Sequence, residues 1–121
     1  MAAPNVVNVS TITGRTDVQS VGTTAAAIAT NSAASNLVYK INSLVVSNID
    51  GVNDADVTVD LFRSSVAYRI ASTITVPADA TLVVISKDIG LYLEEGDSLR
   101  LTASAAGDLQ AICSYEVIDD A

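Results

Sequence analysis

The chain has 121 residues, half of them apolar, and its aromatic residues are four Tyr and one Phe, with no Trp. This length supports one domain with a single core, and a core of Val, Ala, Ile and Leu suits two sheets packed face to face. The net charge of −8 comes from 6 basic and 14 acidic residues, and the dispersed cations disfavour nucleic-acid binding. No apolar run reaches the ~18 residues of a membrane span, and the N-terminus lacks the charge and apolar block of a signal peptide.

Residues 1–13 are interpreted as an N-terminal arm or as a first strand, followed by one β-sandwich domain over residues 14–121. The segment is uncharged and rich in Val and Thr, and Thr13-Gly14 ends its β-rich run. Such a segment can donate a strand to the unpaired edge of a neighbouring subunit. In that arrangement alternate pockets of the neighbour would hold four candidate partner-binding residues, Val6, Val7, Val9 and Ile12. The alternative is that this strand belongs to the protein's own sheet.

Two short runs follow the arm. Residues 18–21 are predicted to form a short strand. Residues 23–30 are ambiguous, because three alanines favour a helix whereas Thr and Ile favour a strand. We expect a strand here, since a segment of this length is too short to be a stable helix by itself.

Residues 36–62 are the most regular stretch. Two β-rich runs flank the loop 49–56, which is rich in Asp, Asn and Gly, as expected for an antiparallel pair joined by a medium loop. In the first run Tyr39, Ile41, Ser43 and Val45 alternate with the residues between them. In the second, Val57, Val59 and Leu61 alternate with polar residues. We expect this pair to form the middle of one sheet.

The second half of the chain contains five further β-rich runs. Glu94-Glu95-Gly96-Asp97 is predicted to be a turn, and Pro77 ends the run before it because proline cannot donate to a ladder. Residues 81–86 form an apolar run typical of a strand that is covered on both faces. The five runs are 67–76, 81–86, 91–93, 99–103 and 109–117.

About eight strands with turn signals every 8–12 residues predict an all-β fold, an antiparallel β-sandwich of jelly-roll or immunoglobulin-like character. The alternation of apolar residues also predicts which side chains are buried. If Leu61 is fully enclosed, Leu61→Ala should cost ~2–5 kcal/mol. The expected core residues are Ile41, Val45, Val59, Leu61, Ile74, Leu82, Val84, Leu101 and Cys113.

No catalytic, cofactor or metal site is predicted. The chain has no His and a single Cys, which excludes imidazole triads and the common zinc sites. Glu94, Glu95 and Asp97 could pair as carboxylates, but a hydrated turn explains them better. The loop 50–56 resembles a calcium loop in composition only, because Gly51 and Val52 break the EF-hand order, and a polar connection is the default interpretation. Cys113 lies in an alternating run and is expected to be a buried, unreactive thiol.

Several sequence features together resemble a known group of proteins. They are Tyr39-Lys-Ile-Asn-Ser-Leu-Val-Val-Ser-Asn48, the Asp-Gly loop, Val57-Thr-Val-Asp-Leu61, Val76-Pro-Ala78, Tyr92-Leu-Glu-Glu-Gly-Asp-Ser-Leu99 and Cys113-Ser-Tyr-Glu-Val117. In order and spacing they are similar to small virion structural proteins of tailed bacteriophages, notably marine and cyanobacterial ones, over about residues 23–118.

The resemblance implies a compact, non-enzymatic β-sandwich without catalytic residues or cofactors. It implies a protein made in the host bacterial cytoplasm and located in the virion, most specifically as a decoration or cement protein on the major capsid lattice. The expected partners are other virion structural proteins and further copies of the chain, without nucleic acid or membrane. A tail, neck or fibre-associated module is the alternative, and a carbohydrate-binding adsorption module, which would have to use Tyr39, Tyr68, Tyr92 and Tyr115, is less favoured.

Overall fold

A computed structural model describes residues 10–119 of the chain. This part of the chain forms nine β-strands, and none of it forms a helix that is long and apolar enough to cross a membrane. The expected all-β class is therefore confirmed. The strands are β1 Thr11–Ser20, β2 Ala26–Thr30, β3 Leu37–Asn48, β4 Ala55–Arg63, β5 Val66–Val76, β6 Thr81–Ile85, β7 Leu91–Leu93, β8 Ser98–Ala103 and β9 Leu109–Asp119.

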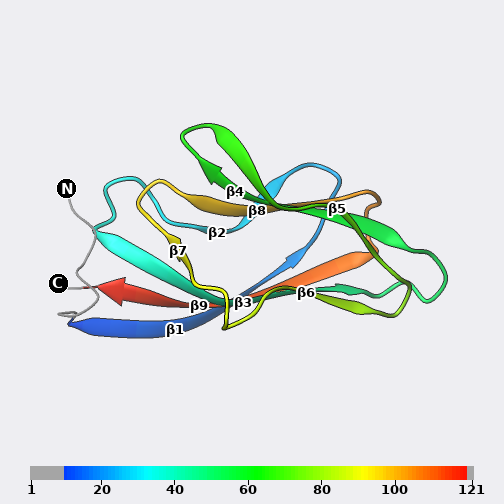
Figure 1. The fold of residues 1–121 in the computed structure, drawn as a ribbon, viewed down its shortest axis with the longest axis horizontal. Coiled ribbons are helices and arrows are strands. Elements are labelled where there is room, and N and C mark those ends of the chain that lie inside the picture. The colour runs from blue at the N-terminus through cyan, green and yellow to red at the C-terminus, as the bar shows by residue number, and fades with distance from the viewer. Residues whose placement is uncertain (1–9, 120–121) are drawn as a thin grey trace.

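The strands form two antiparallel sheets that pack face to face (Figure 1). Sheet A has the order β1-β9-β3-β6, with β7 also paired to β3, and sheet B has the order β2-β8-β4-β5. Because β6 and β7 pair with successive parts of β3, they occupy a single strand position. With β6 and β7 counted as one strand, the two four-strand orders are those of a jelly roll rather than the immunoglobulin grouping.

The expected pairing of the runs in 36–62 is wrong. β3 pairs with β9, β6 and β7 in sheet A, whereas β4 pairs with β8 and β5 in sheet B. β3 and β4 each have one strongly apolar face. These two apolar faces are both buried when the strands lie on opposite sides of the core. The loop between them therefore crosses from one sheet to the other instead of closing a hairpin.

The core lies between the sheets and is aliphatic, as composition predicted, but its membership differs from the expected set. Ile41, Val59, Leu101 and Cys113 are buried, whereas Val45, Leu61, Leu82 and Val84 are half-buried and Ile74 is exposed. On β3 the cause is a register shift between Ile41 and Ser43. A bulge reverses the phase of the side chains after it, so Leu44 and Val46 point inward in place of Ser43 and Val45.

The edge strands explain the other differences. β5 has register shifts against β4, and its Ile70 and Ile74 are 39% and 41% exposed while Val76 is buried. β6 lies at the edge of sheet A, and Val83 is 58% exposed, so the expectation that 81–86 is covered on both faces is wrong. The alternation expected for 109–117 is confirmed, because Leu109, Ala111, Cys113 and Tyr115 are all buried.

The N-terminal part of sheet A also departs from expectation. The first described strand, β1, runs through Thr13-Gly14 without interruption and includes Val18, so Gly14 ends no strand and 18–21 is not a separate one. Residues 11–13 pair with β9, which favours the first-strand interpretation for that part of the segment. Residues 23–30 contain β2, as expected for a strand.

Candidate interaction surface

The outer face of sheet A, directed away from sheet B, carries a continuous row of apolar side chains. Val18 lies opposite Ile112, Ile112 opposite Val45, and Val45 opposite Val83, so the row crosses β1, β9, β3 and β6. Val18 is 75% exposed, Val83 58% and Ile112 45%. Beside Val18 and Ile112 the face is hollowed into a shallow pocket that Ser20 and Gln110 also line. Four apolar side chains from four strands thus face solvent together.

Uncharged polar side chains, mostly Ser and Thr, border this row on both sides. One neighbouring row contains Thr16, Ser114 and Ser43, and the other contains Ser20, Gln110, Ser47 and Thr81. Hydroxyl pairs link the strands in these rows, with Thr16 Oγ1 3.0 Å from Ser114 Oγ and Ser47 Oγ 3.1 Å from Thr81 Oγ1. None of the residues in these three rows is charged, in a chain of net charge −8. We call them together the neutral face.

The inner side of β1 is polar. Tyr115 donates a hydrogen bond from its hydroxyl to Asp17 at 2.6 Å, and the Arg15 guanidinium lies 5.8 Å from the centroid of the Tyr115 ring. Tyr115 stacks on Tyr39, with their ring centroids 5.1 Å apart. Burial and the hydrogen bond to Asp17 raise the pKa of Tyr115, so its hydroxyl stays a donor near neutral pH. Arg15 Nη2 also lies 3.8 Å from Asp17 Oδ1, and the two side chains are 53% and 29% exposed.

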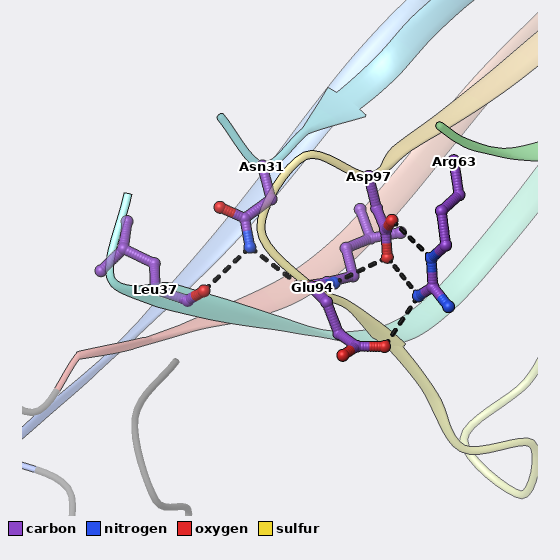
Figure 2. A network of polar contacts seen from close by, with 6 residues as sticks. Asn31, Leu37, Arg63, Glu94 and Asp97 are labelled. Carbon is purple, nitrogen blue, oxygen red and sulfur yellow. Dashed lines mark hydrogen bonds and ion pairs between the residues drawn. The ribbon is translucent and has the colours of Figure 1, made fainter. Parts of the chain in front are cut away.

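The turn Glu94–Asp97 holds the two sheets together at one end of the sandwich (Figure 2). Arg63, at the end of β4, donates from Nε to Asp97 Oδ1 at 2.7 Å and from Nη2 to Glu94 Oε2 at 2.8 Å. Asp97 also accepts the backbone N–H of Glu94. Burial alone would raise the pKa of Asp97, but the hydrogen bonds from Arg63 and from the Glu94 N–H, with the charge of Arg63, hold it below its ordinary value. The expected turn is therefore present, but Asp97 is buried and paired with Arg63 rather than hydrated.

Asn31 completes this network from the end of β2. Its side chain is fully buried, and its amide donates to the carbonyls of Leu37 at 2.9 Å and Leu93 at 3.0 Å (Figure 2). Its own backbone binds the turn in both directions, from Asn31 N–H to the Asp97 carbonyl and from Gly96 N–H to the Asn31 carbonyl. Through its side chain and its backbone, this one residue connects the end of β2 with β3, β7 and the β7–β8 turn.

The acidic loops lie at the other end of the sandwich. Asp50 accepts the N–H groups of Val52 and Asn53, which lower its pKa, while Asp54 accepts the N–H of Ala78. Among residues 10–119 no three His, Cys, Asp or Glu side chains converge in a way that could hold a metal ion. The carboxylates of this loop serve as turn and loop acceptors, as the polar-connection interpretation expects.

The remaining candidate groups do not gather into one exposed site. Cys113 is fully buried, and burial, with the charge of Asp17, raises the pKa of its thiol to about 12. Tyr39 and Tyr115 belong to the core, whereas the exposed Tyr68 and Tyr92 lie in different sheets. The tyrosines therefore form no common platform of the kind a carbohydrate-binding module would present.

Of the predicted partner-binding residues, Val6, Val7 and Val9 lie outside the described part of the chain. Ile12 belongs to β1 and pairs with Ile118 of the protein's own β9, so it does not act as a donated strand residue in this structure. Sequence reasoning missed the neutral face. Its apolar residues lie on the outward-facing positions of strands such as 109–117, between the residues that point into the core. Only the pairing of four distant segments brings them into one row.

No protein-family model matches the chain, and no curated protein is significantly similar to it in sequence. Among solved structures, one of Bacillus endospore appendages, described as a novel family of disulfide-linked pili, is similar in fold with a TM-score of 0.55. The two chains are 16% identical, and the similarity covers 92% of this chain and 88% of the other. At this identity the likeness establishes the β-sandwich fold of the chain.

Proposed function

We propose that the protein is a non-enzymatic structural component that is present in many copies and binds other subunits of a larger particle. The specific role we propose is capsid decoration or cement in the virion of a tailed bacteriophage, as the sequence resemblance implies. The observation that carries the proposal is the neutral face, which exposes Val18, Ile112 and Val83 in one row.

An exposed apolar row bordered by small polar groups is a typical protein-contact surface. The rest of the molecule is strongly acidic, and like charges on two approaching proteins repel. A chain of net charge −8 can approach further copies of itself, or any other acidic protein, most closely through a surface without charges. The neutral face offers this surface on a sheet that several paired strands hold in place.

The fold comparison is compatible with a multicopy role, because the similar structure belongs to pilus-forming appendages. Its disulfide linkage is not transferred to this chain. Cys113 is the single cysteine and is buried in the core, so subunits of this protein would have to associate through non-covalent contacts. A filament is therefore the second setting in which a sandwich of this kind could work.

The copy number in purified virions tests the proposed setting. Quantitative mass spectrometry should find an amount comparable with that of the major capsid protein if the chain decorates the capsid. A far smaller amount would instead favour the tail, neck or fibre-associated alternative. Absence from virions, together with filaments of the purified protein in negative-stain electron microscopy, would overturn the virion proposal.

The neutral face is tested by particle binding with two matched substitutions. Val83→Glu places a charge within the apolar row, whereas Val52→Glu places the same charge in the β3–β4 loop, where the valine is 84% exposed. We expect Val83→Glu to lose binding to particles that lack the protein and Val52→Glu to retain it. Equal binding by both folded variants would refute the role of this face.

The arm hypothesis for Val6, Val7 and Val9 is tested with a deletion of residues 2–9. This truncation leaves every described strand intact. If the arm is an anchor, the truncated protein keeps its melting temperature and loses particle binding. Unchanged binding would show that the anchor lies elsewhere, for example on the neutral face.

A further inference from the structure

The edges of the two sheets differ in their ability to pair with another chain. Within residues 10–119, β2 is short and has a register shift, β6 is short, and β5 is bulged against β4 with a positive φ at Thr73. Short or bulged edges resist pairing with other chains. β1 instead keeps one unbroken register with β9 over all ten of its residues, and its other side has no partner strand in the described sheet. Among the described strands, β1 is therefore the edge best suited to pair with another chain.

The ladder shows which backbone groups of β1 are available. Val21 N–H donates to the Leu109 carbonyl at 2.9 Å, and this pair continues the register of β1 and β9. Hydrogen-bonded and non-hydrogen-bonded pairs alternate in an antiparallel ladder, so the odd-numbered residues of β1 bind β9. The even-numbered residues, from Ile12 to Ser20, direct their N–H and C=O groups to the open side.

We propose that β1 pairs antiparallel with β1 of a second copy of this chain, about a twofold axis at Thr16. Thr16 then lies opposite the second copy's Thr16, and Gly14 lies opposite Val18. All five outward-facing residues of each strand find a partner in this register, which forms about ten backbone hydrogen bonds between the chains. A twofold contact of this kind uses the same surface on both copies.

The charges on β1 select this register. It places Arg15 of each copy directly opposite Asp17 of the other, in a non-hydrogen-bonded pair, where cross-strand side chains are closest. Moving the axis by one residue would place Arg15 opposite Arg15 or Asp17 opposite Asp17. Within one copy Arg15 Nη2 already lies 3.8 Å from Asp17 Oδ1, and the two side chains are 53% and 29% exposed, so each keeps solvent-facing surface that a second copy can contact. The edge is thus complementary to itself in charge as well as in hydrogen bonding.

The pairing would join sheet A of two copies into one continuous sheet, with the two neutral faces side by side. The inference therefore extends the proposed function. It rests on that function because a particle would supply the many neighbouring copies. The doubled surface would present two apolar rows to the same lattice. Two linked contacts bind more tightly than either alone.

Charge reversal provides a direct test in solution. Arg15→Asp and Asp17→Arg each replace attraction by repulsion at both pairs, so each variant alone should dimerise at least about tenfold more weakly than the unmodified protein. An equimolar mixture should restore the dimer, because one chain then carries acidic side chains at positions 15 and 17 and the other carries basic ones at both. Lys87→Asp and Asp88→Arg, in the exposed β6–β7 loop, are controls with the same changes in charge and should not alter dimerisation.

Sedimentation velocity over a range of concentrations measures these dimers, and circular dichroism checks that each variant is folded. A mixture that stays as monomeric as the single variants would overturn the proposed register. A monomeric unmodified protein at millimolar concentration would overturn the pairing itself.

Cysteine cross-linking tests the position of the axis independently. In a Cys113→Ala background, Thr16→Cys should form a disulfide-linked dimer with oxidised glutathione, because the Cα atoms of a hydrogen-bonded pair are about 5.5 Å apart. Ser20→Cys, on the same face of β1 and also exposed, should not, since the pairing places two copies of residue 20 far apart. Equal cross-linking by both variants would refute the inference.

These measurements need no particle, so they separate the inference from the proposed function. Dimers that form in solution but never occur in virions would leave the pairing intact and remove the virion role. Conversely, particle binding that survives in Arg15→Asp, without a dimer, would support the role and refute the pairing.

Discussion

Replacement of Asn31 by Asp should destabilise the protein in a way that depends on pH. Asn31 is fully buried, and its amide is the hydrogen-bond donor to the carbonyls of Leu37 and Leu93. Aspartate has nearly the same shape but has no amide to donate. At neutral pH a carboxylate would face two carbonyl oxygens in the interior, which disfavours the ionised form and raises the pKa of the introduced group.

The size of the effect follows from the two acceptors that lose their donor. An unsatisfied buried carbonyl costs about 1–3 kcal/mol, so two give a loss of roughly 2–6 kcal/mol in the free energy of unfolding. At about 4 °C per kcal/mol for a domain of this size, the melting temperature at pH 7 should fall by roughly 8–24 °C. Near pH 4 the protonated acid can donate to one carbonyl, and the loss should shrink to about half.

Thermal melts followed by circular dichroism between pH 4 and pH 7 would measure this difference. Gln110→Glu is the matched control, because it makes the same amide-to-carboxylate change on an exposed side chain of β9. Comparing the two variants at each pH removes the contribution of the other carboxylates. If Asn31→Asp melted together with Gln110→Glu at all pH values, the role assigned to the buried amide would be refuted.

Three further predictions concern the core, the thiol and the acidic loop. Leu101→Ala should lower the free energy of unfolding by ~2–5 kcal/mol in urea titrations, because Leu101 is fully buried. The exposed Val83 is the control, and Val83→Ala should change the free energy of unfolding by less than about 0.5 kcal/mol. Similar losses in the two variants would contradict the assigned core. The raised pKa of Cys113, from 9.0 to about 12, gives stability that is complete below pH 9 and is lost as the pH rises towards 12. Between pH 9 and 11 the unmodified protein should therefore lose up to about 1.4 kcal/mol per pH unit more than Cys113→Ala, and parallel curves would refute this. Melting curves with EDTA and with excess calcium should superimpose, and an upward shift of many degrees with calcium would make the loop Asp50–Asp56 a binding site.

Local patterns in the sequence were sufficient for much of the fold. Alternating β-branched residues and turn signals predicted strands in the regions of β2 to β6, β8 and β9, including 109–117 with its buried face, and composition predicted a two-sheet aliphatic core. Burial of Cys113 and the structural use of Glu94–Asp97 were also predictable from their surroundings in the sequence. These features depend on contacts within a few residues or on a strand's own alternation.

The errors arose where the outcome depends on pairing between distant segments. The bulge after Ile41 reverses the phase of β3, and no residue near it signals this change in the sequence. β3 and β4 look like a hairpin locally, but each gains more buried apolar area by facing the other across the core. Gly14 looked like the end of a strand, yet the ladder with β9 passes through it.

The sequence by itself determined the class of the protein: an acidic, aliphatic, all-β domain without the His, or the second Cys, that imidazole triads and the common zinc sites need. Only the tertiary structure decided the surfaces. Val18, Val45, Val83 and Ile112 are far apart along the chain and form a row only because four strands align in one register. The open edge of β1 is likewise a property of sheet order. The physical reason is that alternation fixes the two faces of a strand, whereas its neighbours depend on how the whole chain buries its apolar surface.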